Sequence, residues 1–242
     1  MKYGFFSDVH SNDEALTAVA KDFEEQKLDK IYFLGDAVGY GASPNECVKL
    51  ISQVTTKCLM GNHDYASLGL LDTDFFNQYA KDSINWTKTI LNDKILEILS
   101  NYLLCCKQGD FHMVHSTPKE PENWHYILNL SEAEENFSYF TKRVCLIGHS
   151  HRPVIIKKYK DRHCFIHNDS CVQIEEEFRY MINIGSVGQP RDGNNQACYL
   201  IYDADNKTAQ LRRVAYDIKK AQRKMKKANL PQYLIERLAL GR

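Results

Sequence analysis

Two histidines separated by a single residue, His149 and His151, follow the apolar segment 144–148. A structural core has little need for two imidazoles at the end of a buried strand. In a loop just past a strand, side chains two positions apart can converge on two neighbouring points. Imidazole nitrogens are common ligands of divalent metal ions. The pair therefore predicts metal chemistry, and two ions account for both histidines better than one ion does.

Further apolar segments are also followed by groups that could bind a metal. These groups are Asp8 and His10, Asp36, Asn62 and His63, and His115. Each alone also fits a helix cap, a turn or a polar loop, but their repeated position after apolar strands favours one shared site. Nitrogen and oxygen donors without a thiolate suit hard or borderline divalent ions. Manganese is the first choice for a pair of such ions, with iron, zinc and nickel as alternatives.

A centre with two divalent ions suits phosphoryl chemistry. The positive charge of the ions exceeds the negative charge of Asp8 and Asp36, so the pocket would attract phosphate oxygens. A carboxylate shared by both ions would hold them about 3.5–4 Å apart, and a water shared by the ions would ionise near neutral pH and attack phosphorus. His63 is the candidate proton donor for the leaving group. Asp64 is expected to orient the His63 imidazole and keep it protonated.

These groups need strands that carry them to one edge of a sheet. The apolar pattern predicts strands at 2–7, 31–34 and 56–60, and an amphipathic helix at 13–27 with Asn12 as its N-cap. Each strand is followed directly by ligand-type side chains. The carboxyl ends of parallel strands are where open sheets hold their ligands, which places the expected site at that edge.

Other segments are predicted to be helical. One helix has a clear start, with Ser43 as N-cap, Pro44 in the first helical position and Glu46 completing a capping box. The region 74–99 is expected to form two helices, and the insertion 66–100 to cap the strand ends rather than form a separate domain. The tail 216–242 is expected to be helical with a break at a proline and a solvated basic face.

The later half of the chain is rich in strand patterns. The expected strands lie at 103–107, 111–115, 144–148, 154–160, 163–167, 171–175, 180–184, 197–203 and 207–214, with a helix near 131–140. From 154 onward the strands are expected to be mostly antiparallel. A helix-rich first half and a strand-rich second half predict an α/β protein.

Composition narrows the class of partner. With 43% hydrophobic and 26% charged residues the chain is typical of a globular protein, and its 31 basic and 31 acidic residues leave no general positive field for a nucleic acid. A small phosphate ester or nucleotide fits better. The eight cysteines contain no C-x-x-C pair, which indicates reduced core residues and a cytoplasmic location. No window approaches the roughly 20 apolar residues of a membrane span.

The blocks Asp8-Val9-His10, Gly35-Asp36, Gly61-Asn62-His63-Asp64, His115 and Gly148-His149-Ser150-His151 resemble those of the calcineurin-like metallophosphoesterase superfamily. The resemblance spans residues 8–151. It implies a four-layer α/β/β/α sandwich of two mixed sheets, formed by a single domain over 1–242. It also implies that one metal is held by Asp8, His10 and His151, the other by Asn62, His115 and His149, with Asp36 bridging them and His63 donating the proton.

Two longer stretches, 35–46 and 183–192, look like a bacterial subgroup of small phosphoesterases, some of which hydrolyse diadenosine tetraphosphate and others simple phosphodiesters. The second stretch is a glycine-punctuated loop whose backbone could approach the metals or the phosphate. The candidate substrate-binding residues are Tyr40, Arg152, Ser186, Gln189 and Arg191.

The expected function is hydrolysis of small phosphodiesters or nucleotides, and the first alternative is hydrolysis of dinucleoside polyphosphates. From another class, the same fold can serve as a protein-binding scaffold with a vestigial metal site. A complete ligand set and His63 disfavour the scaffold. The balanced charge supports neither a protein phosphatase nor a nuclease.

Overall fold

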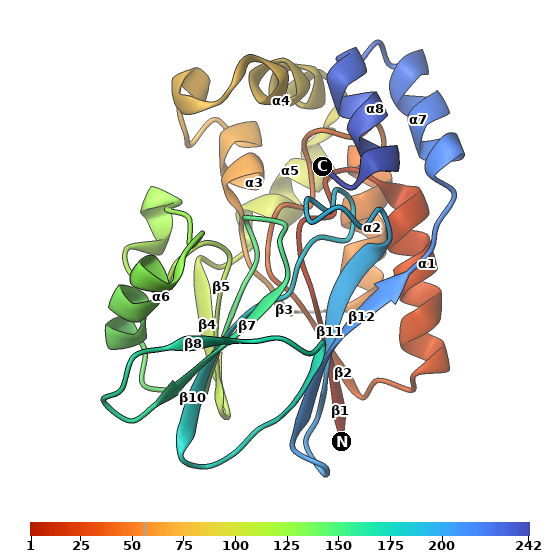
Figure 1. Cartoon of the computed structure of the whole chain (residues 1–242). Coiled ribbons are helices and arrows are strands. Elements are labelled where there is room, and N and C mark those ends of the chain that lie inside the picture. The colour runs from red at the N-terminus through yellow and green to blue at the C-terminus, as the bar shows by residue number, and fades with distance from the viewer. Residues whose placement is uncertain (56) are drawn as a thin grey trace.

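The computed structural model describes residues 1–55 and 57–242 and contains two sheets of six strands each (Figure 1). The first sheet has the order β3-β2-β1-β11-β12-β9. Its strands are β1 (Lys2–Phe6), β2 (Lys30–Phe33), β3 (Lys57–Cys58), β9 (Cys171–Gln173), β11 (Ala197–Asp203) and β12 (Thr208–Val214). β1, β2 and β3 run parallel, whereas β11, β12 and β9 are joined antiparallel.

The second sheet has the order β4-β5-β6-β10-β7-β8. Its strands are β4 (Cys105–Gln108), β5 (Phe111–Val114), β6 (Val144–Ile147), β7 (Val154–Tyr159), β8 (Phe165–His167) and β10 (Phe178–Asn183). The three central strands β5, β6 and β10 are parallel to one another, and the outer strands are antiparallel. Both sheets are therefore mixed, with a parallel part that ends at one common edge.

Helices cover the outer face of each sheet. The helices are α1 (Asp13–Glu25), α2 (Pro44–Val54), α3 (Asn62–Ser67), α4 (Gln78–Ile90), α5 (Asp93–Ser100), α6 (Leu130–Asn136), α7 (Ile218–Lys227) and α8 (Gln232–Leu240), with 3₁₀ turns η1 (Thr73–Phe75), η2 (Pro121–Asn123) and η3 (Phe137–Tyr139). Figure 1 shows α1 and α2 on one side of the sheets and α6 on the other, with α4, α7 and α8 grouped at one end.

Alternating side chains explain the layers. In β1, Phe5 points between the two sheets, whereas its neighbour Phe6 packs under the first-sheet helices. The inter-sheet core also contains Leu146 and Ile182 from the second sheet. Next to Leu146, Ile147 faces the other way, toward the layer that contains α6. Because strand side chains alternate between faces, each central strand contributes to two apolar cores.

The expected architecture is confirmed: two mixed sheets flanked by helices form a four-layer sandwich. Most expected elements lie within a few residues of the observed ones. The start of the third expected strand, Thr56, lies outside the described residues. Among the described residues, β3 comprises only Lys57 and Cys58, and an isolated bridge pairs Leu59 with Leu103.

Three local expectations differ from the structure. Ser43 stands at the N-cap of α2 with Pro44 after it, but its side chain makes no capping hydrogen bond, so the capping box is wrong. The predicted polar loop at Asn62 is instead the first turn of α3. In α5, Ile95 and Leu99 pack in the helical core of the first sheet, so this half of the insertion does not cover the strand ends. The described residues contain no helix long and apolar enough to cross a bilayer.

Candidate metal centre

Four imidazoles at the shared sheet edge each have one nitrogen fixed by a main-chain carbonyl. Nδ1 of His10 lies 3.1 Å from the Val38 oxygen, and Nδ1 of His115 lies 2.8 Å from the Leu34 oxygen. The same pattern holds for His149 Nε2 with Trp124 O at 2.9 Å and His151 Nδ1 with Gln189 O at 2.6 Å. A ring N–H that donates to a carbonyl leaves a lone pair on the other nitrogen, as in metal-binding histidines.

The free nitrogens converge on two buried carboxylates. Asp36 Oδ2 lies 3.5 Å from His10 Nε2 and 3.4 Å from His115 Nε2, so it stands between two groups of ligands. Asp8 Oδ1 lies 3.2 Å from His151 Nε2. The other oxygen of each carboxylate is held by a main-chain N–H, from His149 to Asp8 at 3.1 Å and from His63 to Asp36 at 2.8 Å.

Several buried polar atoms in this cluster have no hydrogen-bond partner among the described residues. They are Asp8 Oδ1, Asn62 Oδ1 and His115 Nε2. In addition, His10 Nε2 and His151 Nε2 face each other at 3.0 Å. Buried lone pairs that face one another without donors are costly, and a bound cation would satisfy them. The donor set therefore fits divalent metal ions, and Asp36 adjoins two groups of possible ligands, one with His10 and His63 and one with His115 and His149.

The backbone at the cluster is strained. Five of the residues expected to bind metal have positive φ angles: Asp8 (54°), His10 (47°), Asp36 (60°), His149 (66°) and His151 (59°). Residues with a Cβ rarely adopt this conformation, which costs about 1–2 kcal/mol each. Such strain concentrated in the loops after β1, β2 and β6 indicates that these loops are shaped to aim side chains rather than to minimise backbone energy.

Burial and charge set the protonation of the cluster. Burial opposes the charge on Asp8, but His151 and His10 hold the pKa of this carboxyl well below its usual range. Burial likewise opposes the charge on Asp36, whose pKa is lowered by His115 and His63. Burial lowers the pKa of both His149 and His151 to about 3. Burial also acts to lower the pKa of His115, but Asp36 raises it to about 9, so a metal ion would have to displace that proton. Ionised carboxylates and neutral imidazoles are the forms that bind metal ions.

Asp64 does not take the expected place beside the His63 ring. Its carboxylate accepts main-chain N–H groups of Asp36 (2.8 Å), Ala37 (2.9 Å), Val38 (3.2 Å) and Gly61 (3.0 Å). These bonds occupy both oxygens, and the bond from the N-cap residue Gly61 fixes the start of α3. The expectation that Asp64 orients His63 is therefore wrong. Asp64 instead holds the loop that carries Asp36 against α3.

The His63 ring packs against aromatic side chains beside the candidate metal ligands. Its ring stacks on Phe76 at 5.2 Å and lies 4.4 Å from the Tyr40 ring and 4.7 Å from the His10 ring, measured between centroids. Nδ1 has no hydrogen-bond partner among the described residues. Burial lowers the pKa of His63 well below its usual value, so the expected protonated form is not favoured by the protein alone.

The glycine-punctuated loop after β10 packs directly on the loop that carries Asp8. The main-chain N–H groups of Val187 and Gly188 donate to the oxygens of Ser7 (3.0 Å) and Asp8 (2.9 Å). A Cβ at Gly188 would collide with the Val9 carbonyl oxygen. Ser186 is fully buried and donates to the Asp8 carbonyl at 2.8 Å. Ser186 therefore holds the loop that carries Asp8, whereas the sequence analysis expected it to contact the substrate.

Of the other expected substrate contacts, Tyr40 and Gln189 are buried, Arg191 is half-buried and Arg152 is exposed. Arg191 donates to Gln189 Oε1 at 2.8 Å, and its guanidinium lies 5.5 Å from the Tyr40 ring. Tyr40 is buried between His10 and His63. Arg152 is exposed and donates from Nε to the Arg191 carbonyl at 3.2 Å. Of these three side chains, Tyr40 contacts the cluster directly and Arg191 lies over the Tyr40 ring.

Sequence reasoning missed three residues of the site. Trp124 supplies the carbonyl that fixes His149, and the Tyr126 ring stacks on His149 with centroids 3.9 Å apart. Asn183 donates to the Gly148 carbonyl at 2.6 Å and holds the turn before His149. Of the three, only Asn183 could have been found from the sequence, because a polar side chain at the end of a buried strand needs a hydrogen-bond partner. Trp124 and Tyr126 lie in a long connection with no periodic pattern.

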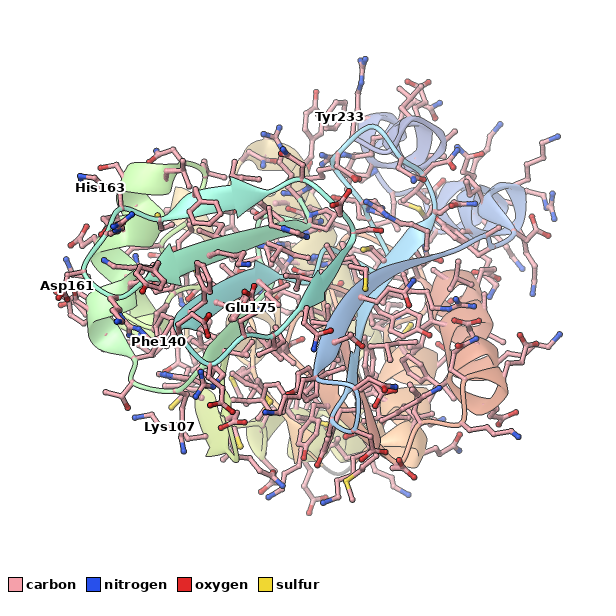
Figure 2. All side chains as sticks on the ribbon, turned by 60° about the horizontal axis from the view of Figure 1, so that its bottom comes forward. Lys107, Phe140, Asp161, His163, Glu175 and Tyr233 are labelled. Atoms are coloured by element: carbon pink, nitrogen blue, oxygen red, sulfur yellow. The ribbon has the colours of Figure 1, made fainter. Side chains whose placement is uncertain are left out.

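Two further histidines, His112 and His163, lie outside the cluster. His112 is buried in β5 beside the Phe140 ring, and burial lowers its pKa to about 4. His163 is exposed, and Figure 2 shows it with Asp161 at the outer edge of the molecule, far from Tyr233 on the C-terminal helices. Neither residue belongs to the candidate centre.

Comparisons with known proteins agree with this geometry. Residues 1–207 match the calcineurin-like phosphoesterase superfamily domain. A metallophosphoesterase from Sphaerobacter thermophilus of known crystal structure is 37% identical, with a TM-score of 0.87 and coverage of 100% of this chain and 99% of that chain. An uncharacterized protein from Methanocaldococcus jannaschii is 41% identical over 240 residues, which cover 98% of this chain and 96% of the relative.

A hypothetical protein from Pyrococcus horikoshii OT3 has a TM-score of 0.81 at 19% identity, covers 100% of this chain and 98% of its own, and shares the fold. The two mixed sheets, with buried histidines and carboxylates at their common edge, define a metal-dependent phosphoesterase. The chain belongs to the calcineurin-like phosphoesterase superfamily.

Proposed function

We propose that this enzyme hydrolyses small phosphodiesters or nucleotides with two divalent ions. One ion is assigned to Asp8, His10 and His151, and the other to Asn62, His115 and His149. Asp36 is shared by both. The observation that carries the proposal is that each of the four imidazoles has one nitrogen fixed by a carbonyl while the other faces the buried carboxylates. When bound, the ions supply Lewis acidity that polarises the phosphoryl oxygens and acidifies the attacking water.

Residues of this chain position the proposed ligands and supply the proton for the leaving group. Loops held by Asp64, Ser186 and Asn183 keep the ligands in strained conformations that need no rearrangement when a cation binds. His63 has an Nδ1 without a hydrogen-bond partner among the described residues, groups with His10 and Asp36, and is assigned as the proton donor to the leaving group. An anionic substrate opposite the ring would favour its protonated form, against the effect of burial.

The test uses purified protein with manganese and bis-p-nitrophenyl phosphate. Wild-type protein is expected to release p-nitrophenol, and Asp36→Ala and His63→Ala are each expected to lower kcat at least about 100-fold. Elemental analysis separates the two variants, because only Asp36→Ala should lose bound metal. Repeating the assay with iron, zinc and nickel identifies the preferred ion. If wild-type protein turns over no phosphate ester with any of these metals, the proposal is wrong.

A dinucleoside polyphosphate hydrolase is the second candidate, and Arg191 beside Tyr40 favours it because a guanidinium and an aromatic ring suit a second phosphate and a base. Diadenosine tetraphosphate would then give two ADP, or ATP and AMP. We place the reaction in the cytoplasm, which suits eight cysteines that are all free thiols. The complete ligand set favours an enzyme over a protein-binding scaffold.

A further inference from the structure

A cleft of about 200 Å³ opens on the outer face of the second sheet, the face that also packs against α6. Val154 and Ile156 of β7 and Ile166 of β8 line it. Val154 pairs with Asn183, the last residue of β10, and Ile156 pairs with Ile166. The parallel strands of this sheet end at Asn183, so the cleft begins at the same edge as the candidate metal centre.

A second group of lining residues comes from the connection that leads into α6. Ile127, Leu128 and Leu130 contribute to the cleft, and α6 begins at Leu130. The same connection contacts the centre one residue earlier, where the Tyr126 ring stacks on His149 with centroids 3.9 Å apart. One short segment therefore covers a proposed metal ligand and then forms a wall of the cleft.

The loop after β6 joins the cleft to the centre from the other side. Ser150 stands between His149 and His151 in the chain, and it lines the cleft together with Arg152. Arg152 is exposed and donates to the main-chain oxygen of Arg191. In the described part of the chain, no Asp or Glu side chain forms an ion pair with it. A phosphate anion bound at the centre would therefore have a complementary charge beside it, at the entrance to the cleft.

The cleft is mainly apolar, and part of its apolar surface is open to solvent. Leu128 is 63% exposed, Ile166 49% and Leu130 37%, whereas Ile127 and Ile156 are buried. Large exposed apolar side chains that gather around one cleft are typical of ligand sites, because a ligand removes their surface from water. The volume is several times the roughly 30 Å³ that one water molecule occupies in the liquid. An organic group of several carbon atoms fits this space.

We infer that this cleft binds the ester group that stays on phosphorus, and that it favours an apolar group. In the hydrolysis, water forms a new P–O bond, the bond to the leaving oxygen breaks, and that oxygen takes a proton. The proton is assigned to His63, whose ring packs on Tyr40 and Phe76, and neither of these residues lines the cleft. The leaving group therefore faces His63, and the cleft is free for the retained group.

The inference rests on the proposed function and narrows its substrates to phosphodiesters in which one ester group is apolar. The methyl and n-butyl esters of p-nitrophenyl phosphate share a leaving group and differ only in the retained group. With excess manganese, wild-type protein is expected to have a KM about tenfold lower for the butyl ester at similar kcat. A tenfold preference corresponds to burial of roughly two methylene groups.

Two substitutions test the cleft from separate elements. Leu128→Asn and Ile166→Thr should each reduce the preference for the butyl ester to about threefold or less. Leu240→Asn is the matched control, because Leu240 is a similarly exposed leucine (55%) of α8 that does not line the cleft. It should keep the tenfold preference. Thermal unfolding is measured on all four proteins, and the exposed positions are expected to leave the unfolding temperature unchanged.

Methylphosphonate and n-butylphosphonate report the same preference without turnover, since their P–C bond is not an ester bond. Their affinities are measured by calorimetry at the same manganese excess. Equal affinities for wild type overturn the inference, as does a preference that survives both cleft substitutions. A preference lost equally in Leu240→Asn, or lost only together with a lower unfolding temperature, also contradicts it. If wild-type protein hydrolyses neither ester but binds butylphosphonate more tightly, the proposed function is wrong and the cleft retains its role in binding.

Discussion

Asp36 is the residue that joins the two halves of the centre, since one of its oxygens lies within 3.5 Å of both His10 and His115. Its other oxygen is held by the first turn of α3 through the His63 N–H. The geometry of this one side chain therefore depends on its loop, and the loop depends on Asp64. That dependence can be tested at the level of single residues.

Asp64→Asn should destabilise the protein by about 1–3 kcal/mol, because an amide supplies fewer acceptors to the four N–H groups that the carboxylate now satisfies. Denaturant unfolding measures the change in free energy. Metal affinity should fall with it, because the Asp36 loop loses its support. His63→Asn is the comparison, since it should lower activity with little change in stability. Unaltered stability together with a shifted pH–rate profile would instead restore an orienting role for Asp64.

Among the elements, the loops after the parallel strands do most to shape the site. The loop after β10 is hydrogen-bonded to the loop after β1 through Val187 and Gly188, so strands from both sheets position Asp8. In the loops after β1, β2 and β6, several non-glycine residues have positive φ angles, a conformation that is rare outside such loops.

Gly188→Ala is expected to destabilise the protein by about 1–3 kcal/mol and to lower its metal content, because the new methyl group collides with the Val9 carbonyl. Gly193→Ala is the control, since Gly193 has open space around it and a φ of +83°. It should cost only the backbone strain, about 1–2 kcal/mol, and leave metal content unchanged. Equal metal content in the two variants would contradict close packing between the two loops.

A partly buried ion pair ties helix α1 to strands β11 and β12 of the first sheet. Asp22 accepts hydrogen bonds from Tyr199 at 2.6 Å and from Arg212 Nη2 at 2.8 Å. The bond from Arg212 holds the pKa of Asp22 below its usual value. A carboxyl with a lowered folded-state pKa adds stability above its unfolded pKa of about 3.9 and loses it as pH falls through the folded value.

Asp22→Asn should therefore cost about 1–3 kcal/mol near pH 7, and the gap from wild type should narrow as pH falls from 5 toward 3. Urea unfolding at several pH values measures it. The exposed Asp161 provides the control variant Asp161→Asn, for which little change is expected at any pH. A gap that stays constant from pH 7 to pH 3 would mean that the charge of Asp22 does not contribute.

At the scale of the whole molecule, the centre lies where both sheets and the connecting loops meet, so metal binding should stabilise the entire fold. Excess manganese at 100 times its dissociation constant would add about 2.7 kcal/mol, and each kcal/mol raises Tm by about 2–4 °C in a protein of this size. We expect a rise of about 5–10 °C in calorimetry, reversed by a chelator. Asp36→Asn should show little rise, and an equal rise in that variant would place the binding elsewhere.

Helix α8 packs on Tyr40, a residue of the loop that follows β2. Leu234 and Leu238 of α8 share one buried cluster with Tyr40, although these residues are far apart in the chain. The basic residues of this tail were expected to form a solvated face, and Lys224 instead pairs with both Asp13 and Glu14 of α1. A run of charged residues predicts that a helix face is exposed to solvent. Which of those charges form ion pairs depends on how the helix packs against the rest of the fold.

The sequence by itself determined most of the strands and helices and the set of candidate ligands. Period-two and period-3.6 apolar patterns are local, and ligand types recur directly after the strands, so Asp8, Asp36 and His149 could be named before any coordinates. Tertiary structure decided how these groups are held. Asp64 stands next to His63 in the chain, yet its carboxylate bonds to the loop of Asp36, because four orphaned N–H groups there have a stronger need for an acceptor. Trp124 and Tyr126 join the site only by long-range packing, which no local pattern encodes.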